Sequence, residues 1–290
     1  MVVVNTNAAE LLVALGARDR ITGASDTVKN HPLLGPQFAG IGSIGSWQTP
    51  NIEKVLSLNP DLVVSYASSK PKNEDPFTQN RIPILYIDCY RLDTLESDAK
   101  ILGSLTSREN DASSYAALVN TWQDLVKSRV SNVSQVDKPR VYFEGYSDYS
   151  AQPGSSGSGL LIRRAGGRNI AENLSVAAPK VNAEWVMTEN PDVIIKVVSP
   201  TKDGINFTTI HSQIVSRPGM QNVNAVRNGR VFVISGDVAY GPRFYIGLLT
   251  IAKMLYPDRF RDINPQAALD EYAQRFVVGT NLTPFVYPEP

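Results

Sequence analysis

The sequence predicts an α/β protein of two similar lobes, each with a mainly parallel sheet flanked by helices, joined by one long helix. Three observations support this prediction. The segment NIEKVLSLNPDLVVSY at 51–66 returns in similar form as NAEWVMTENPDVIIKV at 182–197. Strand-like and helix-like segments alternate in both halves of the chain, as in α/β proteins. Between the halves, residues 108–132 have apolar side chains at helical spacing and neither Gly nor Pro.

Each copy of the repeated segment predicts a helix, a tight turn and a buried strand. Asn51 and Asn182 can cap a helix through their side-chain oxygens. The Asn-Pro pair that follows ends the helix, because the residue before proline is kept out of the α region. The apolar runs at 62–64 and 193–195 are typical of strands buried on both faces of a parallel sheet. Two similar domains explain this repeat better than a solenoid, whose period is only about 20 to 50 residues.

Other strands and a second repeat complete the two lobes. We expect strands at 2–4, 84–90, 140–146 and 230–236. The tripeptide Gly-Ala-Arg at 16–18 returns as Gly-Gly-Arg at 166–168, but the first half holds 19 more residues than the second between this motif and the repeated segment. The additional residues lie in a loop rich in Pro and Gly that contains Trp47. We therefore predict an N-terminal lobe at 1–107, a linking helix at 108–132 and a C-terminal lobe at 133–290.

Composition excludes several classes of protein. The formal net charge is zero, from 28 basic and 28 acidic residues, and no basic run is present, so we expect no nucleic-acid partner. No apolar segment reaches the roughly 20 residues that span a bilayer. The single cysteine, Cys89, follows an apolar strand and is expected to be a buried thiol. Met1 leads directly into a strand, so we expect a targeting segment to have been removed ahead of it.

Metal and enzyme sites find little support in the residues. His31 and His211 are the only histidines, so a bare zinc or manganese ion held by a His-rich site is not expected. Neither histidine has the setting of a catalytic base. The segment PGSSGSG at 153–159 lacks the Gly-Lys-Ser/Thr ending of a phosphate-binding loop, and we expect it to be a flexible loop of the ligand cleft.

Four segments, taken together, resemble a known family over nearly the whole chain. They are AAELLVALGARDRITGAS, IGSWQTPNIEKVLSLNPDLVVSY, GRNIAENLSVAAPKVNAEWVMTENPDVIIKV and AVRNGRVFVISGDVAYGPRFYIGLLTIAKMLYPDRF. They are similar to the substrate-binding proteins of ABC importers for iron-siderophores, haem and vitamin B12. The resemblance implies a non-enzymatic, extracytoplasmic protein, expected to be a monomer, that delivers a small-molecule metal chelate to an ABC permease dimer. It implies no resident cofactor.

The resemblance also implies a ligand cleft between the lobes. The residues that it places there are Asn5, Thr6, Trp47, Tyr66, Tyr146, Ser147, Tyr240, Arg243 and Tyr245. Aromatic walls and an arginine suit a flat or chelated anionic ligand. Each tyrosine could instead belong to the core or the rim of a lobe, and Arg243 could pair within its own lobe.

Glu53 and Glu184 occupy equivalent positions in the two copies of the repeat. In the family, a surface glutamate at this position of each lobe pairs with arginines of the permease, so the resemblance implies that both residues dock on the permease. A carboxylate suits this role because it binds guanidinium through two hydrogen bonds. The alternative is an ordinary acidic residue in the first turn of a helix.

The ligand itself stays open at this point. A ferric siderophore is the first expectation. Cobalamin or another corrinoid comes second, because the SWQ around Trp47 resembles the cobalamin-binding branch, and haem held by a tyrosine comes third. The rival class is a two-lobed chelatase-like enzyme.

Overall fold

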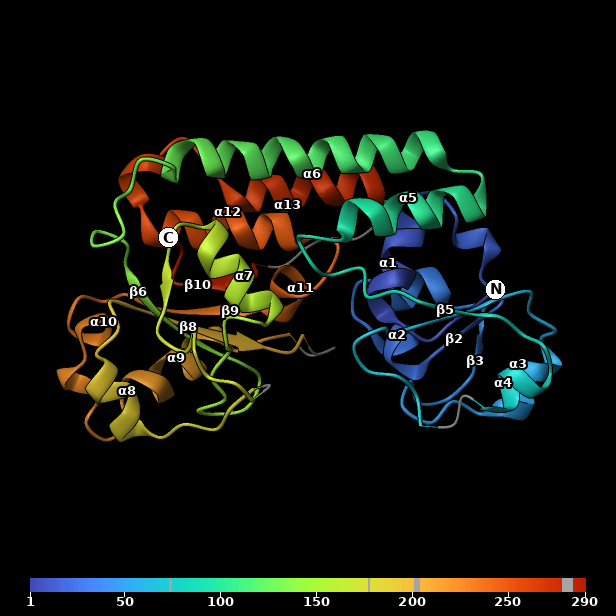
Figure 1. Cartoon of the computed structure of the whole chain (residues 1–290), viewed down its shortest axis with the longest axis horizontal. Coiled ribbons are helices and arrows are strands. Elements are labelled where there is room, and N and C mark those ends of the chain that lie inside the picture. The colour runs from blue at the N-terminus through green and yellow to red at the C-terminus, as the bar shows by residue number, and fades with distance from the viewer. Residues whose placement is uncertain (73–74, 177, 201–203, 278–283) are drawn as a thin grey trace. The chain divides into compact units, whose positions relative to one another are not determined.

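A computed structural model describes residues 1–72, 75–176, 178–200, 204–277 and 284–290 (Figure 1). The chain divides into two compact units. Unit 1 comprises Met1–Leu118 and Tyr272–Leu282, and unit 2 comprises Val119–Glu271 and Thr283–Pro290. The predicted lobes differ from these units at the C-terminal end, where Tyr272–Leu282 returns to unit 1.

Unit 1 is built on a parallel sheet with the strand order β3-β2-β1-β4-β5. Its strands are β1 (Val2–Val3), β2 (Gly23–Ala24), β3 (Gly42–Ser43), β4 (Val63–Ser65) and β5 (Ile84–Tyr86). Its helices are α1 (Thr6–Ala14), α2 (Asp26–Asn30), α3 (Ile52–Ser57), α4 (Asp75–Gln79) and α5 (Leu95–Thr106), with 3₁₀ turns at Arg18–Arg20 and Gly35–Phe38.

Unit 2 has a second sheet, with the order β10-β9-β8-β6-β7, in which only β10 runs antiparallel to its neighbour. Its strands are β6 (Arg140–Glu144), β7 (Arg168–Asn169), β8 (Val193–Val198), β9 (Val231–Ser235) and β10 (Val286–Tyr287). Its helices are α7 (Gly157–Arg164), α8 (Ala183–Glu189), α9 (Phe207–Val215), α10 (Asn224–Arg227), α11 (Gly236–Ala239) and α12 (Phe244–Leu255), with 3₁₀ turns at Met220–Asn222 and Pro257–Phe260.

The two sheets share a four-strand core, which confirms the prediction of two similar α/β lobes. The order β2-β1-β4-β5 in unit 1 corresponds to β7-β6-β8-β9 in unit 2. Unit 1 adds β3 beside β2, and unit 2 adds β10 beside β9. Strand β3 and helix α2 lie in the Pro- and Gly-rich segment that makes the first half longer. The extra residues of the first lobe thus extend its sheet by one edge strand.

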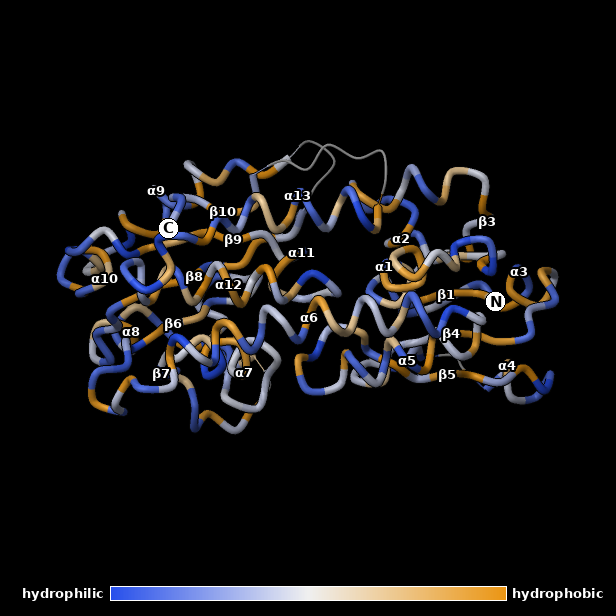
Figure 2. Tube along the Cα trace, turned by 90° about the horizontal axis from the view of Figure 1, so that it is seen from above, coloured by the Kyte–Doolittle hydropathy of each residue, from blue (hydrophilic) through white to orange (hydrophobic). Residues whose placement is uncertain are grey.

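The repeated segment forms a capped helix followed by a strand in each unit, as predicted. The Asn51 side chain accepts a hydrogen bond from the backbone N–H of Lys54 at 3.0 Å, and that of Asn182 accepts one from Trp185 at 2.8 Å. Helices α3 and α8 therefore begin at equivalent places, and β4 and β8 follow them into the sheets. The strands are mainly hydrophobic, as Figure 2 shows for β1 and β9.

Among the described helices, α6 (Glu109–Val130) and α13 (Pro265–Phe276) each contain a boundary between the units. Helix α6 confirms the predicted long helix and contains the boundary after Leu118. Helix α13 contains the boundary before Tyr272. Within unit 1, the buried Tyr272 hydroxyl donates a hydrogen bond to Glu10 of α1 at 2.8 Å. This hydrogen bond joins α13 to a residue of α1 that lies 262 positions earlier in the chain. None of the described helices has both the length and the hydropathy of a membrane-spanning segment.

Candidate ligand-binding site

Each sheet has a carboxyl edge, the side on which its parallel strands end. Ligands of open α/β sheets bind at this edge, because loops and helix N-termini gather there. In unit 1, β1 leads into Asn5 and Thr6, β4 into Tyr66, and β5 into Asp88. Predicted ligand residues from separate parts of the sequence therefore meet at the carboxyl edge of unit 1.

Asn5 organises this edge from a fully buried position. Its Oδ1 accepts hydrogen bonds from the backbone N–H groups of Asn7 at 2.8 Å and Ala8 at 3.2 Å, which caps α1. Its Nδ2 donates to the carbonyl oxygen of Ile87 at 2.5 Å. Both ends of the amide are thus used to join the first turn of α1 to the end of β5. Asn5 supports the site from below its surface, which the sequence prediction did not distinguish from direct ligand contact.

Thr6, Tyr66 and Trp47 form a connected group beside Asn5. The backbone N–H of Thr6 donates to the Tyr66 hydroxyl at 3.1 Å. The Trp47 ring lies edge-on to Tyr66, with centroids 5.2 Å apart and an interplanar angle of 68°. Burial raises the pKa of Tyr66, although its hydrogen bond with Thr6 opposes that rise. The Thr6 hydroxyl is buried, and among the described residues it has no hydrogen-bond partner.

Asp88 is a residue of this edge that the sequence analysis missed. Its Oδ1 accepts three hydrogen bonds, from Ala67 N at 3.1 Å, Ser68 N at 3.0 Å and Ser68 Oγ at 2.8 Å. These bonds fix the turn directly after Tyr66. Nearby, the Lys70 ammonium lies 4.0 Å from the centre of the Tyr86 ring. The sequence offered no signal for this role, because Asp88 falls inside the predicted strand 84–90, whereas β5 ends at Tyr86.

Unit 2 presents a second aromatic pair at its own carboxyl edge. Tyr146 follows β6 and Tyr240 follows α11, the short helix after β9, and their ring centroids are 5.5 Å apart at 55°. The Tyr240 hydroxyl accepts a hydrogen bond from the buried Ser158 at 2.9 Å. Tyr146 is 53% exposed, and Ser147 beside it is also exposed. A Cβ on Gly236 would lie 2.4 Å from the Tyr146 hydroxyl, so the absence of a side chain at Gly236 leaves space for the Tyr146 ring.

Arg243 and Tyr245 are buried, with 2% and 1% exposure. The Arg243 guanidinium lies 3.6 Å from the Asp237 carboxylate of α11, in the same unit. This geometry favours the alternative that Arg243 pairs within its own lobe. Tyr245 lies in the first turn of α12, a helix whose residues are almost all buried. The sequence alone did not show on which side of the helix these residues fall.

The Gly-rich segment at 153–159 differs from the prediction of a flexible loop. Helix α7 begins inside it at Gly157, and the Ser156 side chain accepts a hydrogen bond from Gly159 N at 3.0 Å. A Cβ on Gly159 would lie 2.4 Å from the Pro153 carbonyl oxygen. The glycine therefore serves close packing of the helix start.

A cluster of four charged residues, three of them largely buried, underlies the Tyr146 loop, and we call it the charge cluster. It consists of Glu144, Asp148, Lys196 and Arg217. Lys196 stands opposite Glu144 in the β6–β8 register, with Nζ 2.9 Å from Oε1. Arg217 binds both oxygens of Glu144, at 2.8 and 2.9 Å. Glu144 and Lys196 could have been noticed in the sequence, because each is a charged residue within an apolar strand. Nothing in the sequence marked Arg217 as their partner.

The charge cluster keeps both of its acids ionised. Burial works against the Glu144 carboxylate, but the hydrogen bond from Arg217 and the charge of Lys196 outweigh it, so the pKa of Glu144 is lowered. For Asp148, partial burial is likewise outweighed by Lys196 and Arg217, which lower its pKa. Burial, together with the neighbouring Glu144 carboxylate, raises the pKa of Tyr142. Two positive and two negative charges leave the cluster neutral.

Glu53 and Glu184 are exposed, and each lies in the first turn of its helix, α3 and α8 respectively. Both side chains are therefore accessible to a partner. Cys89 is buried and free, as expected, and burial raises the pKa of its thiol. Within the described residues, no group of three or more His, Cys, Asp and Glu side chains is placed to hold a metal ion.

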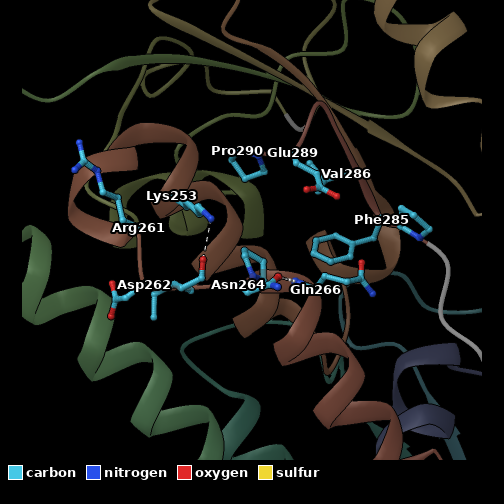
Figure 3. A pocket seen from close by; sticks show the side chains of 12 residues that line it. Lys253, Arg261, Asp262, Asn264, Gln266, Phe285, Val286, Glu289 and Pro290 are labelled. Carbon is cyan, nitrogen blue, oxygen red and sulfur yellow. Dashed lines mark hydrogen bonds between the residues drawn. The ribbon is translucent and has the colours of Figure 1, made fainter.

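A separate pocket in unit 2, of about 310 Å³, lies where the end of α12, the start of α13 and the C-terminal segment meet (Figure 3). Its polar side chains already bond to the protein: Lys253 donates to the Ile263 carbonyl oxygen at 2.8 Å, and Asn264 caps α13. None of the predicted ligand residues lines this pocket. We therefore take the carboxyl edge of each sheet, within its own unit, as a candidate ligand-binding surface.

Comparison with known proteins identifies the family. A family model described as periplasmic binding protein matches residues 1–238. Because this match covers most of the chain, the chain belongs to the periplasmic binding protein family. The family model and several relatives carry the names of binding proteins.

Several relatives share most of their length with this chain. An uncharacterized ABC transporter substrate-binding lipoprotein, YvrC of Bacillus subtilis, is 25% identical over 266 residues, which is 87% of this chain and 78% of the relative. A vitamin B12-binding protein of Yersinia pestis is 27% identical over 198 residues, or 68% of each chain. The structure of the molybdate-binding protein MolA of Haemophilus influenzae, bound to molybdate, has a TM-score of 0.81 at 22% identity and covers 97% of this chain and 93% of its own. At this identity the likeness shows the fold.

Proposed function

We propose that this chain is the extracytoplasmic substrate-binding protein of an ABC importer and that its cargo is an organic metal chelate, a ferric siderophore first and a corrinoid second. The observation that carries the proposal is the pair of aromatic side chains at each carboxyl edge, Trp47 with Tyr66 in unit 1 and Tyr146 with Tyr240 in unit 2. Aromatic rings bind the flat or apolar surface of an organic ligand.

The charges around the aromatic pairs support a chelate over a bare anion. Arg243 lies beside Asp237, and the charge cluster below Tyr146 is neutral. A small oxyanion needs several unsatisfied donors or a net positive charge to replace its hydration. A chelate carries its metal inside an organic shell, so contacts with aromatic rings suffice to hold it.

A small oxyanion such as molybdate is the second candidate. It is favoured by the likeness to MolA and by the buried Thr6 hydroxyl, which has no hydrogen-bond partner among the described residues. Thr6 is the first residue of α1, where the helix dipole favours an anion. The adjacent N–H groups of Thr6, Asn7 and Ala8, however, already donate to Tyr66 and Asn5.

Titration of tryptophan fluorescence tests the proposal. Ferric hydroxamate and ferric catecholate siderophores, cyanocobalamin, haemin and sodium molybdate would each be added to the purified protein. We expect saturable quenching by one of the chelates and none by molybdate. The same titration with Trp47→Phe should lose most of the signal, because the other tryptophans, Trp122 on α6 and Trp185 on α8, belong to neither aromatic pair. Saturation by molybdate with no response to any chelate would favour the second candidate.

Glu53 and Glu184 are the proposed contacts with the permease. Their exposure and their equivalent positions in the two units support this part of the proposal. One docking point per lobe suits a permease made of two subunits, and each carboxylate offers two acceptors to an arginine.

A further inference from the structure

Asp148 is the one member of the charge cluster that faces solvent. Its side chain is 69% exposed, whereas those of Lys196, Arg217 and Glu144 are 5%, 11% and 1% exposed. A single oxygen of Asp148, Oδ1, lies 3.2 Å from Lys196 Nζ and 2.9 Å from an Arg217 Nη. The Asp148 carboxylate therefore lies between solvent and the two buried cations, Lys196 and Arg217.

The remaining three members of the cluster carry a net charge of +1. Glu144 neutralises only one of the two cations, although it contacts both. Lys196 also donates to the Tyr146 carbonyl oxygen at 3.3 Å, and the Arg217 guanidinium lies 4.5 Å from the centre of the Tyr149 ring. Both cations are thus fixed in place by groups other than Asp148.

We propose that Asp148 is a specificity-determining residue: its carboxylate is a resident counter-ion that occupies an oxyanion position between Lys196 and Arg217 and so excludes small inorganic oxyanions from the carboxyl edge of unit 2. This inference rests on the proposed function, in which the cargo is a chelate, and names how the same edge rejects bare anions. Discrimination of this kind depends on an element that repels the wrong ligand as well as on contacts with the right one.

The geometry at Asp148 suits a tetrahedral oxyanion once the carboxylate is removed. Lysine and arginine donate charge-assisted hydrogen bonds to any oxyanion, and the planar guanidinium is the preferred partner of such groups. The two donors converge on one oxygen position, as they would on one oxygen of molybdate or sulfate. An Ala at position 148 would leave this position open and the excess positive charge in place.

Isothermal titration calorimetry with sodium molybdate and sodium sulfate, at constant ionic strength, tests the proposal. The variant is Asp148→Ala, and the matched control is Asp258→Ala, which removes an 82% exposed carboxylate of the same unit that pairs with Arg261. We expect Asp148→Ala to bind both oxyanions about tenfold or more tightly than the unmodified protein, the scale of one charge-assisted hydrogen bond. Asp258→Ala should behave as the unmodified protein does. Adding Arg217→Gln to Asp148→Ala should abolish the gain.

The test remains decisive if Asp148→Ala is less stable, because an anion that binds the native state raises the melting temperature by an amount that grows with the logarithm of its concentration divided by Kd. Asp148→Ser offers a second variant with a short side chain. Two results would overturn the proposal: oxyanion binding by a folded Asp148→Ala variant no tighter than by the unmodified protein, or an equal gain in Asp258→Ala. Failure of every chelate to bind would count against the proposed function instead, because the oxyanion gain is measured without any chelate.

Discussion

Trp47 lies edge-on to Tyr66, with ring centroids 5.2 Å apart, and the Tyr66 hydroxyl in turn accepts a hydrogen bond from the first turn of α1. This arrangement connects the loop after β3, the end of β4 and the start of α1. The loop that carries Trp47 belongs to the segment that only the first half of the sequence contains. A ligand-contacting side chain on an added loop is a common source of specificity.

Replacing Trp47 with Ala should weaken binding of the chelate about tenfold or more, the scale of an interface hot spot. Because the ring is partly buried against the hydrophobic core of unit 1, we also expect a loss of about 1–2 kcal/mol in the free energy of unfolding. The matched control is Trp185→Ala, which removes an edge-on contact with Tyr142 in unit 2. It should cost similar stability and leave affinity unchanged. Equal affinity losses in both variants would place Trp47 in the core alone.

Replacing Gly236 with Ala tests the second aromatic pair. The added Cβ would lie 2.4 Å from the Tyr146 hydroxyl and must displace that ring from Tyr240. We expect affinity for the chelate to fall about two- to tenfold, the scale of one aromatic contact. The helix start should tolerate Ala, so the melting temperature should stay close to its original value. Gly40→Ala, where a Cβ would meet no atom within 4 Å, is the control. Unchanged affinity in Gly236→Ala would remove Tyr146 from the site.

Replacing Glu53 and Glu184 with Gln tests docking on the permease. Gln keeps the shape of the side chain and removes the charge, and the helix should lose only a few tenths of a kcal/mol through its dipole. Docking predicts unchanged affinity for the chelate, reduced uptake by the reconstituted transporter for each single variant, and a larger loss for the double variant. Asp258→Asn serves as an exposed acidic control. Normal uptake by the double variant would leave the glutamates as ordinary first-turn residues.

The charge cluster predicts how stability depends on pH. The folded-state pKa values of Glu144 and Asp148 lie below their ordinary values of 4.5 and 3.8, so their contribution is complete above those values and is lost as the pH falls below them. Glu144→Gln should cost about 3–5 kcal/mol at pH 7, because it leaves two cations without their buried partner. That difference from the unmodified protein should shrink below about pH 4. Thermal unfolding followed by circular dichroism measures both, and a difference that stays constant with pH would contradict the assignment.

The sequence predicted those parts of the fold that depend on nearby residues. The asparagine caps, the Asn-Pro stops and the apolar runs act over a few positions, so α3, α8, β4 and β8 were predicted correctly. The absence of Gly and Pro, together with helical spacing, likewise predicted α6. The hydrogen bond from Tyr272 of α13 to Glu10 was not predicted, because no residue near Tyr272 in the sequence indicates a partner 262 positions away.

The candidate site was predicted by residue type better than by residue role. Trp47 contacts Tyr66 and Tyr146 contacts Tyr240, and the role of these four residues in ligand binding stays a prediction. Asn5, predicted to contact the ligand, is buried and bonds to the backbone around it. The roles of Asp88 and Arg217 come from turns and strands brought together only by folding, so no spacing in the sequence could have indicated them.

The central claim is that this chain binds an organic metal chelate through its aromatic side chains, and calorimetric titration of the unmodified protein with the same set of chelates and with sodium molybdate tests it most directly. The account predicts one molecule of a ferric siderophore or a corrinoid per chain, with micromolar or tighter affinity. It also predicts a larger dissociation constant for the chelate when Trp47 or Tyr146 is replaced by Ala. Tight binding of molybdate in the absence of any chelate binding, or chelate affinity unaffected by both replacements, would contradict it.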